Sequence, residues 1–243
     1  MTGRVAIVTG AARGLGLAVA ERFVADGYRL AVVDADEDGL AVATSAIEAL
    51  GADVAPIRAD IRGRGACAAA VGSTVERFGS VDVLVNSAGV YPRRPVLDIS
   101  AEDWQFVFEV NVLGTYFMMI EAIAAMRDGG GGRIVNVSSI DGFKAHPANA
   151  HYAATKAAVI SLTRSVALEV APLGILVNSV APGPMATETA KTADWYAPML
   201  AALPTRQPIE PSEIANLIAY LSHPDNVSIA GENIVVSGAG VIV

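Results

Sequence analysis

The chain has 243 residues, of which 53% are hydrophobic and 17% charged, a balance that is typical of a globular protein with a sizeable core and excludes extended disorder. Its 25 acidic and 17 basic residues give a formal net charge of -8, and no basic run offers a surface for nucleic acid or an anionic membrane. The single cysteine, Cys67, cannot form an intrachain disulfide, and the apolar run at 5–8 is too short for a signal peptide, so we expect a soluble, cytoplasmic protein.

Short runs rich in β-branched residues alternate with longer segments of helical spacing along the whole chain. We expect strands at residues 5–8, 30–33, 54–57, 81–85, 134–137, 176–180 and 234–236, and helices at residues 14–26, 38–50, 64–78, 101–126, 152–171, 188–202 and 211–222. This order predicts an α/β protein with a doubly wound, seven-stranded parallel sheet and helices on both faces. No linker divides the chain, so we expect one domain over residues 1–243.

A glycine-rich turn, "TGAARGLG", follows the first predicted strand and contains Gly10, Gly14 and Gly16. Glycines at such a turn let the backbone approach a pyrophosphate, and the amides at the start of the next helix attract its charge. A glycine turn alone is also compatible with a tight connection that binds nothing. Its place directly after the first strand favours a dinucleotide site.

Asp34 ends the second predicted strand, at the place where a carboxylate can accept hydrogen bonds from both adenosine ribose hydroxyls. The same carboxylate would repel a 2′-phosphate, which favours NAD over NADP. Arg13, inside the glycine turn, favours NADP if its guanidinium reaches that phosphate, but it could instead pair with Asp34 or stay solvated. Asp34 could also be a helix cap in the "DADEDG" segment.

Tyr152 and Lys156 lie four residues apart in "HYAATK", which places them on one face of a helix. A free tyrosine has a pKa near 10, so it is a poor base at neutral pH. We expect the ammonium of Lys156, together with the positive charge of an oxidised nicotinamide, to lower the pKa of Tyr152. The pair is also compatible with a tyrosine packed on the sheet and a lysine that reaches water.

Two polar residues upstream support the catalytic interpretation. Ser139 ends the predicted strand "GRIVNVSS", where its hydroxyl would lie beside a ligand at the carboxyl edge of the sheet. Asn111 lies within a predicted helix, where its side-chain amide can hold a water molecule or a freed backbone carbonyl.

These motifs occur in an order that resembles the short-chain dehydrogenase/reductase family, in its single-domain branch with a Rossmann fold. The resemblance covers residues 4–236 and includes the glycine turn, Asp60, the "NSAG" motif at 86–89, Asn111, Ser139, Tyr152, Lys156, the Pro182-Gly183 pair and Thr187. It implies that Tyr152 is the general acid or base, that Ser139 orients the substrate oxygen, that Lys156 binds the nicotinamide ribose and lowers the tyrosine pKa, and that Asn111 supports a proton-carrying water. Hydride would pass directly to or from the nicotinamide, without a metal.

The resemblance also assigns the remaining cofactor contacts. The expected contacts are Gly10, Gly14 and Gly16 at the pyrophosphate, Arg13 and Leu15 in the same turn, Asp34 at the adenosine ribose, Asp60 and Ile61 at adenine, Asn86, Ala88 and Gly89 along the adenosine ribose side, and Tyr152, Lys156, Pro182, Gly183 and Thr187 toward the nicotinamide. The chain departs from the family pattern at Ser87, within "NSAG", and at Ser237-Gly238-Ala239-Gly240, where many relatives have Asp-Gly-Gly. The second departure puts contacts between subunits in doubt.

The segment at 185–210 is expected to form a lid over the substrate. A hydrophobic, partly aromatic pocket would include Tyr91, His151, Trp195, Tyr196 and Met199, although core packing explains each of them as well, and His151 could be an exposed helix-start residue. We therefore expect an NAD-dependent oxidoreductase that interconverts a hydrophobic or aromatic secondary alcohol and its ketone.

We also consider two alternative functions and expect an oligomer. An NADPH-dependent 3-oxoacyl-carrier-protein-type ketoreductase would explain Arg13, and a non-catalytic cofactor-sensing protein would explain the glycine turn but not Ser139, Tyr152 and Lys156 together. The resemblance suggests a homotetramer, built partly by the apolar helices at 101–126 and 152–171.

Overall fold

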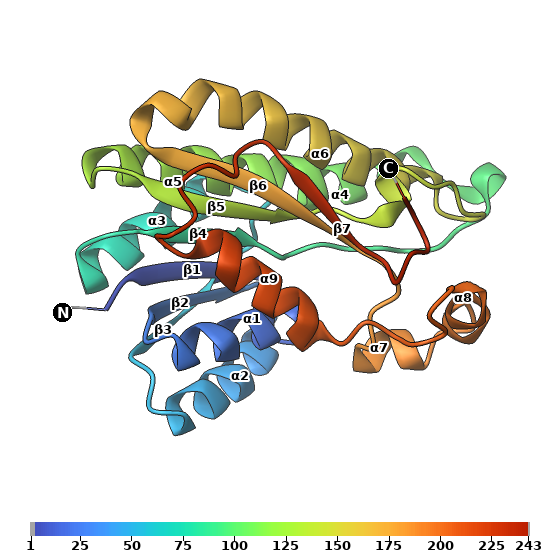
Figure 1. Cartoon of the computed structure of the whole chain (residues 1–243), viewed down its shortest axis with the longest axis horizontal. Coiled ribbons are helices and arrows are strands. Elements are labelled where there is room, and N and C mark those ends of the chain that lie inside the picture. Colours follow the sequence, from blue (N-terminus) through green and yellow to red (C-terminus); the bar gives the residue numbers. More distant parts are fainter. Residues whose placement is uncertain (1–2, 243) are drawn as a thin grey trace.

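A computed structural model describes residues 3–242 and contains a seven-stranded parallel sheet (Figure 1). The strands are β1 (Val5–Thr9), β2 (Arg29–Asp34), β3 (Val54–Arg58), β4 (Val83–Asn86), β5 (Gly132–Val137), β6 (Ile175–Pro182) and β7 (Asn233–Val236), in the sheet order β3-β2-β1-β4-β5-β6-β7. The predicted seven strands and the Rossmann-type α/β fold are confirmed. The strand order reverses between β1 and β4, which creates a crevice at their carboxyl ends.

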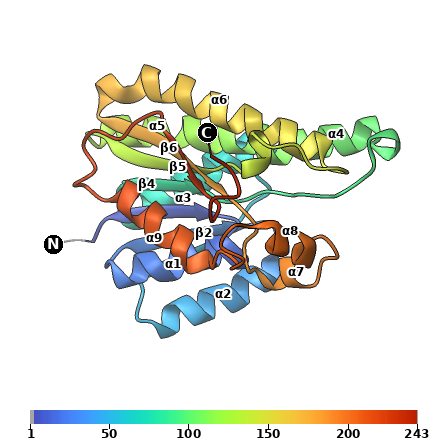
Figure 2. The same cartoon turned by 45° about the vertical axis from the view of Figure 1, so that its right-hand side comes forward.

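Helices cover both faces of the sheet, so the strands are buried on two sides and read as continuous apolar runs. One face packs against α1 (Gly14–Ala25), α2 (Glu37–Ala49) and α9 (Pro211–Ser222). The other packs against α3 (Arg64–Phe78), α5 (Thr115–Asp128) and α6 (Ala150–Val170). Figures 1 and 2 show α1 and α2 on one side of the sheet and α5 and α6 on the other.

The helix expected at 101–126 has three parts. A capping box between Ser100 and Asp103 begins α4 (Ala101–Phe108), a π-helix spans Glu109–Gly114, and α5 continues to Asp128. At Gly114 a Cβ atom would lie 2.6 Å from the side chain of Ile61, so only glycine allows this close contact. The stretch Ala101–Asp128 is long and apolar enough to span a membrane, but its buried methionines belong to the core, so this is weak support for a span.

The helix predicted at 188–202 is interrupted. The structure forms α7 (Glu188–Lys191) and α8 (Tyr196–Ala202), with a turn at residues 192–195 between them. The two short helices lie side by side beyond the end of β6 (Figure 2). A bridge between Met185 and Ile209, with a hydrogen bond from Ala186 N to the Ile209 carbonyl, joins the two ends of the segment.

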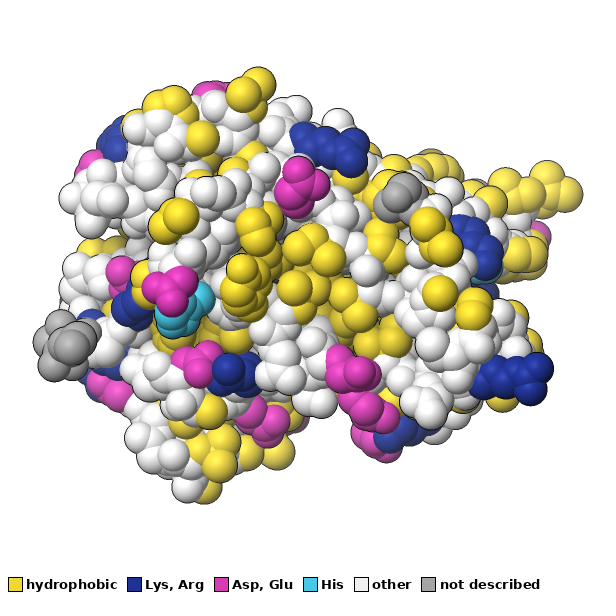
Figure 3. Space-filling model, viewed as in Figure 1, with side chains coloured by type: hydrophobic (Ala, Val, Ile, Leu, Met, Phe, Trp, Pro, Cys, Tyr) yellow, Lys and Arg dark blue, Asp and Glu magenta, His cyan; other side chains and the backbone are white. Residues whose placement is uncertain are grey.

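Short 3-10 helices at Val96–Asp98, Ile140–Gly142 and Ala171–Leu173 complete the regular structure of the described chain. On the face in Figure 3, Lys and Arg side chains are scattered, several of them beside Asp and Glu, and apolar side chains gather near the centre. That face has no basic stripe of the kind that nucleic acid would require.

Candidate active site

At the strand-order reversal, the residues that follow β1 and β4 are in direct contact. Gly10 has a φ of +68°, and a Cβ on it would lie 2.7 Å from the Ala88 backbone. Thr9 Oγ1 accepts hydrogen bonds from the backbone N–H groups of Ser87 and Ala88, both at 3.2 Å. The glycine turn and the "NSAG" motif therefore form one wall of a single site.

The N-terminus of α1 fits a pyrophosphate. Arg13 occupies the N-cap position, and within residues 3–242 no side chain caps the helix. The first helical hydrogen bond runs from Leu17 N to the Arg13 carbonyl, so the amides of the first turn remain available to an anion. A Cβ on Gly16 would overlap the Gly10 carbonyl oxygen, which explains the glycine. Leu15 is buried, so only its backbone faces the turn.

Asp34 lies at the end of β2 and closes the adenosine side of the turn. Its two carboxylate oxygens accept hydrogen bonds from the backbone N–H groups of Ala12 and Asp36, both at 3.0 Å. The helix cap expected as an alternative for Asp34 is provided by Asp36, whose side chain accepts from Gly39 N. Each Asp34 oxygen keeps a free lone pair, so the carboxylate can still receive hydroxyl donors.

Arg13 pairs with Asp36 and not with Asp34. The Nη2–Oδ2 distance is 2.7 Å, and the arginine side chain is 72% exposed. An exposed ion pair of this kind contributes little stability, so it leaves Arg13 able to move. Asp36 is a site residue that the sequence analysis missed, although the "DADEDG" segment contains it.

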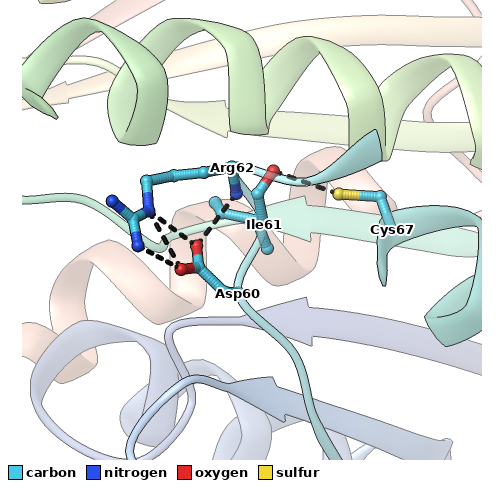
Figure 4. Close-up of polar contacts among 4 residues, drawn as sticks. All are labelled: Asp60, Ile61, Arg62 and Cys67. Atoms are coloured by element: carbon cyan, nitrogen blue, oxygen red, sulfur yellow. Dashed lines mark hydrogen bonds and ion pairs between the residues drawn. The ribbon is translucent and has the colours of Figure 1, made fainter. Parts of the chain in front are cut away.

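Asp60 and Ile61 follow β3 and lie close to Asp34, because Ala59 N donates to the Asp34 carbonyl at 2.9 Å. Figure 4 shows both oxygens of Asp60 engaged by Arg62, whose hydrogen bonds are the main cause that lowers the pKa of Asp60. The Ile61 carbonyl accepts from the Cys67 thiol, and burial raises the pKa of Cys67 to about 11, so this thiol is unreactive.

The side chain of Asn86 does not reach the crevice. It is 3% exposed, and its Nδ2 donates to Asn136 Oδ1 at 2.9 Å across β4 and β5. The expected contact of Asn86 with the ribose side is therefore limited to its backbone. At Gly89 a Cβ would lie 3.2 Å from Asn111 Oδ1 and 3.5 Å from Lys156 Nζ, so this glycine borders the catalytic residues.

Asn111 lies in the π-helix and is fully buried. Its side chain accepts from Val90 N at 2.8 Å and donates to the Val90 carbonyl at 2.9 Å and to Thr155 Oγ1 at 3.1 Å. A backbone carbonyl, one of the two partners expected for this amide, is provided by Val90. Asn111 thus connects the loop after "NSAG" to α6.

Ser139 and Tyr152 come together where β5 ends and α6 begins. Asp141 N donates to Ser139 Oγ at 3.1 Å, which leaves the serine hydroxyl hydrogen free to donate. Burial raises the pKa of Tyr152 above its ordinary value of 10.0, while hydrogen bonding with Ser139 acts in the opposite direction. In the protein alone, desolvation of the phenolate thus outweighs the nearby donors. The lowered pKa expected with an oxidised nicotinamide beside the tyrosine stays a prediction.

Lys156 does not reach water, so the alternative of a solvated lysine is wrong. Its side chain is 5% exposed, and Nζ donates to the Val137 carbonyl at 2.8 Å. Nζ lies 5.7 Å from the centroid of the Tyr152 ring. Burial lowers the pKa of Lys156 to about 8, so the ammonium still predominates at neutral pH.

The segment after β6 faces the glycine turn. Gly183 N donates to the Val236 carbonyl at 2.8 Å and continues the pairing that Pro182 makes with β7. Thr187 caps α7, and its Cγ2 would lie 3.7 Å from a Cβ on Gly14. The residues predicted for the nicotinamide end and for the pyrophosphate thus approach each other.

The predicted substrate residues divide into two groups. The Tyr91 ring lies 6.3 Å from the Tyr152 ring, and Met199 lines a cavity of about 40 Å³ with Ile140 and Pro184. Trp195 stacks under the guanidinium of Arg93, and Tyr196 is buried beside it.

His151 does not join the substrate residues. It is 0% exposed and lies 6.2 Å from the Trp104 ring of α4, so both roles considered for it, a substrate contact and an exposed helix start, are wrong. The physical reason is that α6 begins at Ala150 and packs this turn on α4.

The sequence analysis missed a polar cluster after Ser139. His146 Nδ1 contacts Asp141 Oδ1 at 2.6 Å, and Asn149 Nδ2 donates to Asp141 Oδ2 at 2.5 Å.

At the carboxyl terminus, Ser237 Oγ is hydrogen-bonded to the backbone of Val241, and a Cβ on Gly238 would lie 2.5 Å from Thr205 Oγ1. The Ser237-Gly238-Ala239-Gly240 turn therefore supports residues 203–205 within the same chain.

Comparison with known proteins agrees with this geometry. A family model described as short chain dehydrogenase matches residues 4–196. The chain is 35% identical over 242 residues to the 3-alpha-(or 20-beta)-hydroxysteroid dehydrogenase of Mycobacterium bovis, covering 99% of this chain and 90% of that protein. It is 34% identical over 244 residues to a 3-oxoacyl-acyl-carrier-protein reductase of Synechocystis, covering 100% and 98%. A solved actinorhodin polyketide ketoreductase with NADPH has a TM-score of 0.93 at 32% identity, covering 98% and 97%. The chain therefore belongs to the short-chain dehydrogenase/reductase family.

Proposed function

We propose that this oxidoreductase interconverts a secondary alcohol and its ketone with NAD. The observation that carries the proposal is the convergence of Ser139, Tyr152 and a buried Lys156 at the carboxyl edge of the sheet, beside the glycine turn. A cofactor sensor without catalysis would not need this cluster, which counts against the non-catalytic alternative.

The residues present fit a dinucleotide. The amides at the start of α1 would hold the pyrophosphate, Asp34 the adenosine ribose, the Ala88 and Gly89 backbone the middle of the crevice, and Lys156 the nicotinamide ribose. When bound, the nicotinamide would donate or accept the hydride directly.

The chain itself would supply the proton. In ketone reduction, Tyr152 O–H would donate to the substrate oxygen while Ser139 holds that oxygen by a second hydrogen bond. A raised tyrosine pKa suits the acid role, because the phenol stays protonated at neutral pH. In alcohol oxidation, Tyr152 would act as a base only after its pKa falls, and the positive charge of an oxidised nicotinamide would supply that shift.

Two carboxylates support the choice of NAD. Asp34 ends β2, on the side proposed for the adenosine ribose, and Asp36 pairs with Arg13. A 2′-phosphate beside Asp34 would face its negative charge, and it would compete with Asp36 for Arg13.

The second candidate is an NADPH-dependent 3-oxoacyl-type ketoreductase. The exposed, weakly held Arg13 favours it, because this guanidinium could leave Asp36 for a phosphate. The names of the Synechocystis reductase and the actinorhodin ketoreductase point the same way.

The substrate is proposed to be hydrophobic or aromatic, under a lid formed by residues 185–210. Tyr91, Trp195, Met199 and Ile140 provide the apolar surface, and the Met185–Ile209 bridge would act as the base of the lid. The hydroxysteroid dehydrogenase among the relatives is named for a substrate of this chemistry.

We also infer a cytoplasmic homotetramer that binds neither membrane nor nucleic acid. The helical stretch at 101–128 leaves Trp104, Phe106, Phe108 and Tyr116 between 38% and 42% exposed, an apolar face that a second copy would cover. Light scattering at several protein concentrations would detect the tetramer, and a monomer at every concentration would contradict it.

The proposed function is tested by assaying the purified protein with NAD(H) and NADP(H) on a panel of aliphatic and aromatic secondary alcohols and ketones. We expect turnover with NAD(H) and higher kcat/KM for hydrophobic substrates. Preference for NADP(H) and 3-oxoacyl thioesters would support the second candidate, and no turnover of any alcohol or ketone would contradict both.

A further inference from the structure

Arg93 is a guanidinium at the mouth of the proposed active site that has no carboxylate partner among residues 3–242. Its Nη2 contacts Met199, which lines a cavity with Ile140, the residue after Ser139. Arg93 also follows Tyr91 by two residues, and the Tyr91 ring lies 6.3 Å from the Tyr152 ring. Its neighbour in the loop, Arg94, differs, because it pairs with Asp103 at 3.2 Å. The two adjacent arginines therefore have different electrostatic environments.

The contacts of Arg93 orient its planar guanidinium but leave most of its N–H groups without a strong acceptor. Its central carbon lies 4.8 Å from the centroid of the Trp195 ring, and Nη2 contacts the weak acceptor Met199 Sδ at 3.7 Å. Stacking uses the face of a guanidinium, while the N–H groups around its edge remain directed outward in a fork that matches a carboxylate. A half-buried guanidinium without a strong acceptor favours an anionic ligand.

Asp141, a carboxylate whose charge acts on Tyr152, is hydrogen-bonded by two other side chains. Asp141 Oδ1 contacts His146 and Asp141 Oδ2 accepts from Asn149, and its side chain is 10% exposed. The partners of Asp141 are thus His146 and Asn149, and no ion pair joins it to Arg93. Arg93 therefore has no ion-pair partner within the described chain.

We propose that Arg93 binds a carboxylate group of the substrate, so that this enzyme acts on secondary alcohols and ketones whose hydrophobic body carries an acid. The arginine would fix the acid end while Ser139 and Tyr152 hold the reacting oxygen. Because Arg93 stacks on Trp195, binding of the acid would also change the surroundings of Trp195 in the proposed lid at 185–210. The proposal rests on the proposed function and narrows its substrate class.

The test compares 3-acetylbenzoate and 4-acetylbenzoate with their neutral primary amides, using NADH as reductant. For the wild type we expect a higher kcat/KM for at least one acid than for its amide. Arg93→Gln should lower kcat/KM for that acid about 10- to 100-fold and that for the amide less than about 3-fold, because a charge-assisted hydrogen bond is lost. Arg93→Lys should recover part of the loss, and Arg94→Gln, the matched control, should leave the ratio unchanged.

An equal loss for acid and amide in Arg93→Gln would overturn the proposal and make Arg93 a lid contact only, and so would no loss for either. A second readout does not need turnover. Benzoate should change the tryptophan fluorescence of the wild type, benzamide should not, and both Arg93→Gln and Trp195→Phe should lose the response. If the wild type still shows the benzoate response but reduces neither these four ketones nor any ketone of the panel above, the proposed function fails and the anion site stands. If the ketones turn over and benzoate binds no better than benzamide, only the anion site fails.

Discussion

The ammonium of Lys156 donates a hydrogen bond to the carbonyl oxygen of Val137, 2.8 Å away, on a side chain that is 5% exposed. A cation held in this way has lost most of its water, and burial lowers its pKa to about 8. The folded protein therefore loses stability to keep a positive charge beside the Tyr152 ring, as is typical of functional sites.

Lys156→Met should stabilise the fold while it removes turnover. An amine whose folded pKa lies below its unfolded value of 10.5 destabilises the native state at every pH below about 8, and the cost is relieved as the pH rises toward 10.5. Burying the charged ammonium costs the folded state about 3 kcal/mol, which the methionine variant avoids. The variant also loses the hydrogen bond to Val137, which offsets about 1 kcal/mol of that gain. Urea unfolding should thus show a gain of about 2 kcal/mol at neutral pH, which disappears near the unfolded pKa. Lys191→Met, at an exposed ion pair, is the control and should change little. A variant that is less stable than the wild type at neutral pH would contradict this explanation.

Tyr152→Phe should lower kcat by about 100- to 10,000-fold, the range that a positioned acid or base contributes. The affinity for NADH should change less than about 3-fold, because the ring and its packing remain. Fluorescence titration with NADH beside steady-state assays separates the two effects. Tyr220→Phe removes a hydroxyl from an exposed tyrosine on α9 and should leave both quantities intact. Retained turnover in Tyr152→Phe would exclude this phenol as the proton donor.

Cofactor choice should respond to Asp34 and Asp36. Asp34→Ala removes a ribose acceptor and a negative charge, and Asp36→Asn releases Arg13 from its ion pair. Each substitution should raise the ratio of kcat/KM for NADP over NAD by about 5-fold or more. The two effects should not simply add in the double variant, because Asp36 N donates a hydrogen bond to Asp34. Glu37→Gln is the control, since Glu37 pairs with Arg58 on the exposed surface. An unchanged ratio in both single variants would refute this account of selectivity.

Gly10→Ala should destabilise the protein by about 3 kcal/mol, because alanine is strained at a φ of +68° and its Cβ would meet the Ala88 backbone. Cofactor affinity should fall with it, since the two ends of β1 and β4 would separate. Gly72→Ala, in the interior of α3 with open space around a Cβ, should instead stabilise by about 0.5–1 kcal/mol. Thermal unfolding with and without NADH checks both signs, and equal behaviour of the two variants would disprove the packing argument.

The periodicity of the sequence predicted all seven strands and most helices, because a parallel sheet buried on both faces needs apolar runs and each crossover needs an amphipathic helix. The π-helix at Glu109–Gly114 has no periodic signal, since it depends on the contact of Gly114 with Ile61, distant in sequence. The break between α7 and α8 is a turn in which Ala193 N donates to the Ala190 carbonyl. Such a turn differs little in free energy from a continued helix, so the sequence pattern does not reveal it.

The site was predictable where a residue type has one geometric role, and not where its role depends on partners. The positions of Tyr152 and Lys156 on one helix face follow from spacing alone, but the direction of the tyrosine pKa required knowledge of burial. The pairing of Arg13 with Asp36 depends on how the loop after β2 folds. His151 was misplaced because its neighbour in sequence, Tyr152, lies on a different side of α6.

The central claim is that the phenol of Tyr152 exchanges the proton during hydride transfer. A pH titration of the near-ultraviolet phenolate absorbance, taken as the difference between the wild type and Tyr152→Phe, follows this one group. Without cofactor we predict a pKa above 10.0, and with saturating NAD a pKa below 10.0, since the added positive charge favours the phenolate. A phenol that still titrates above 10.0 when NAD is bound would contradict the account.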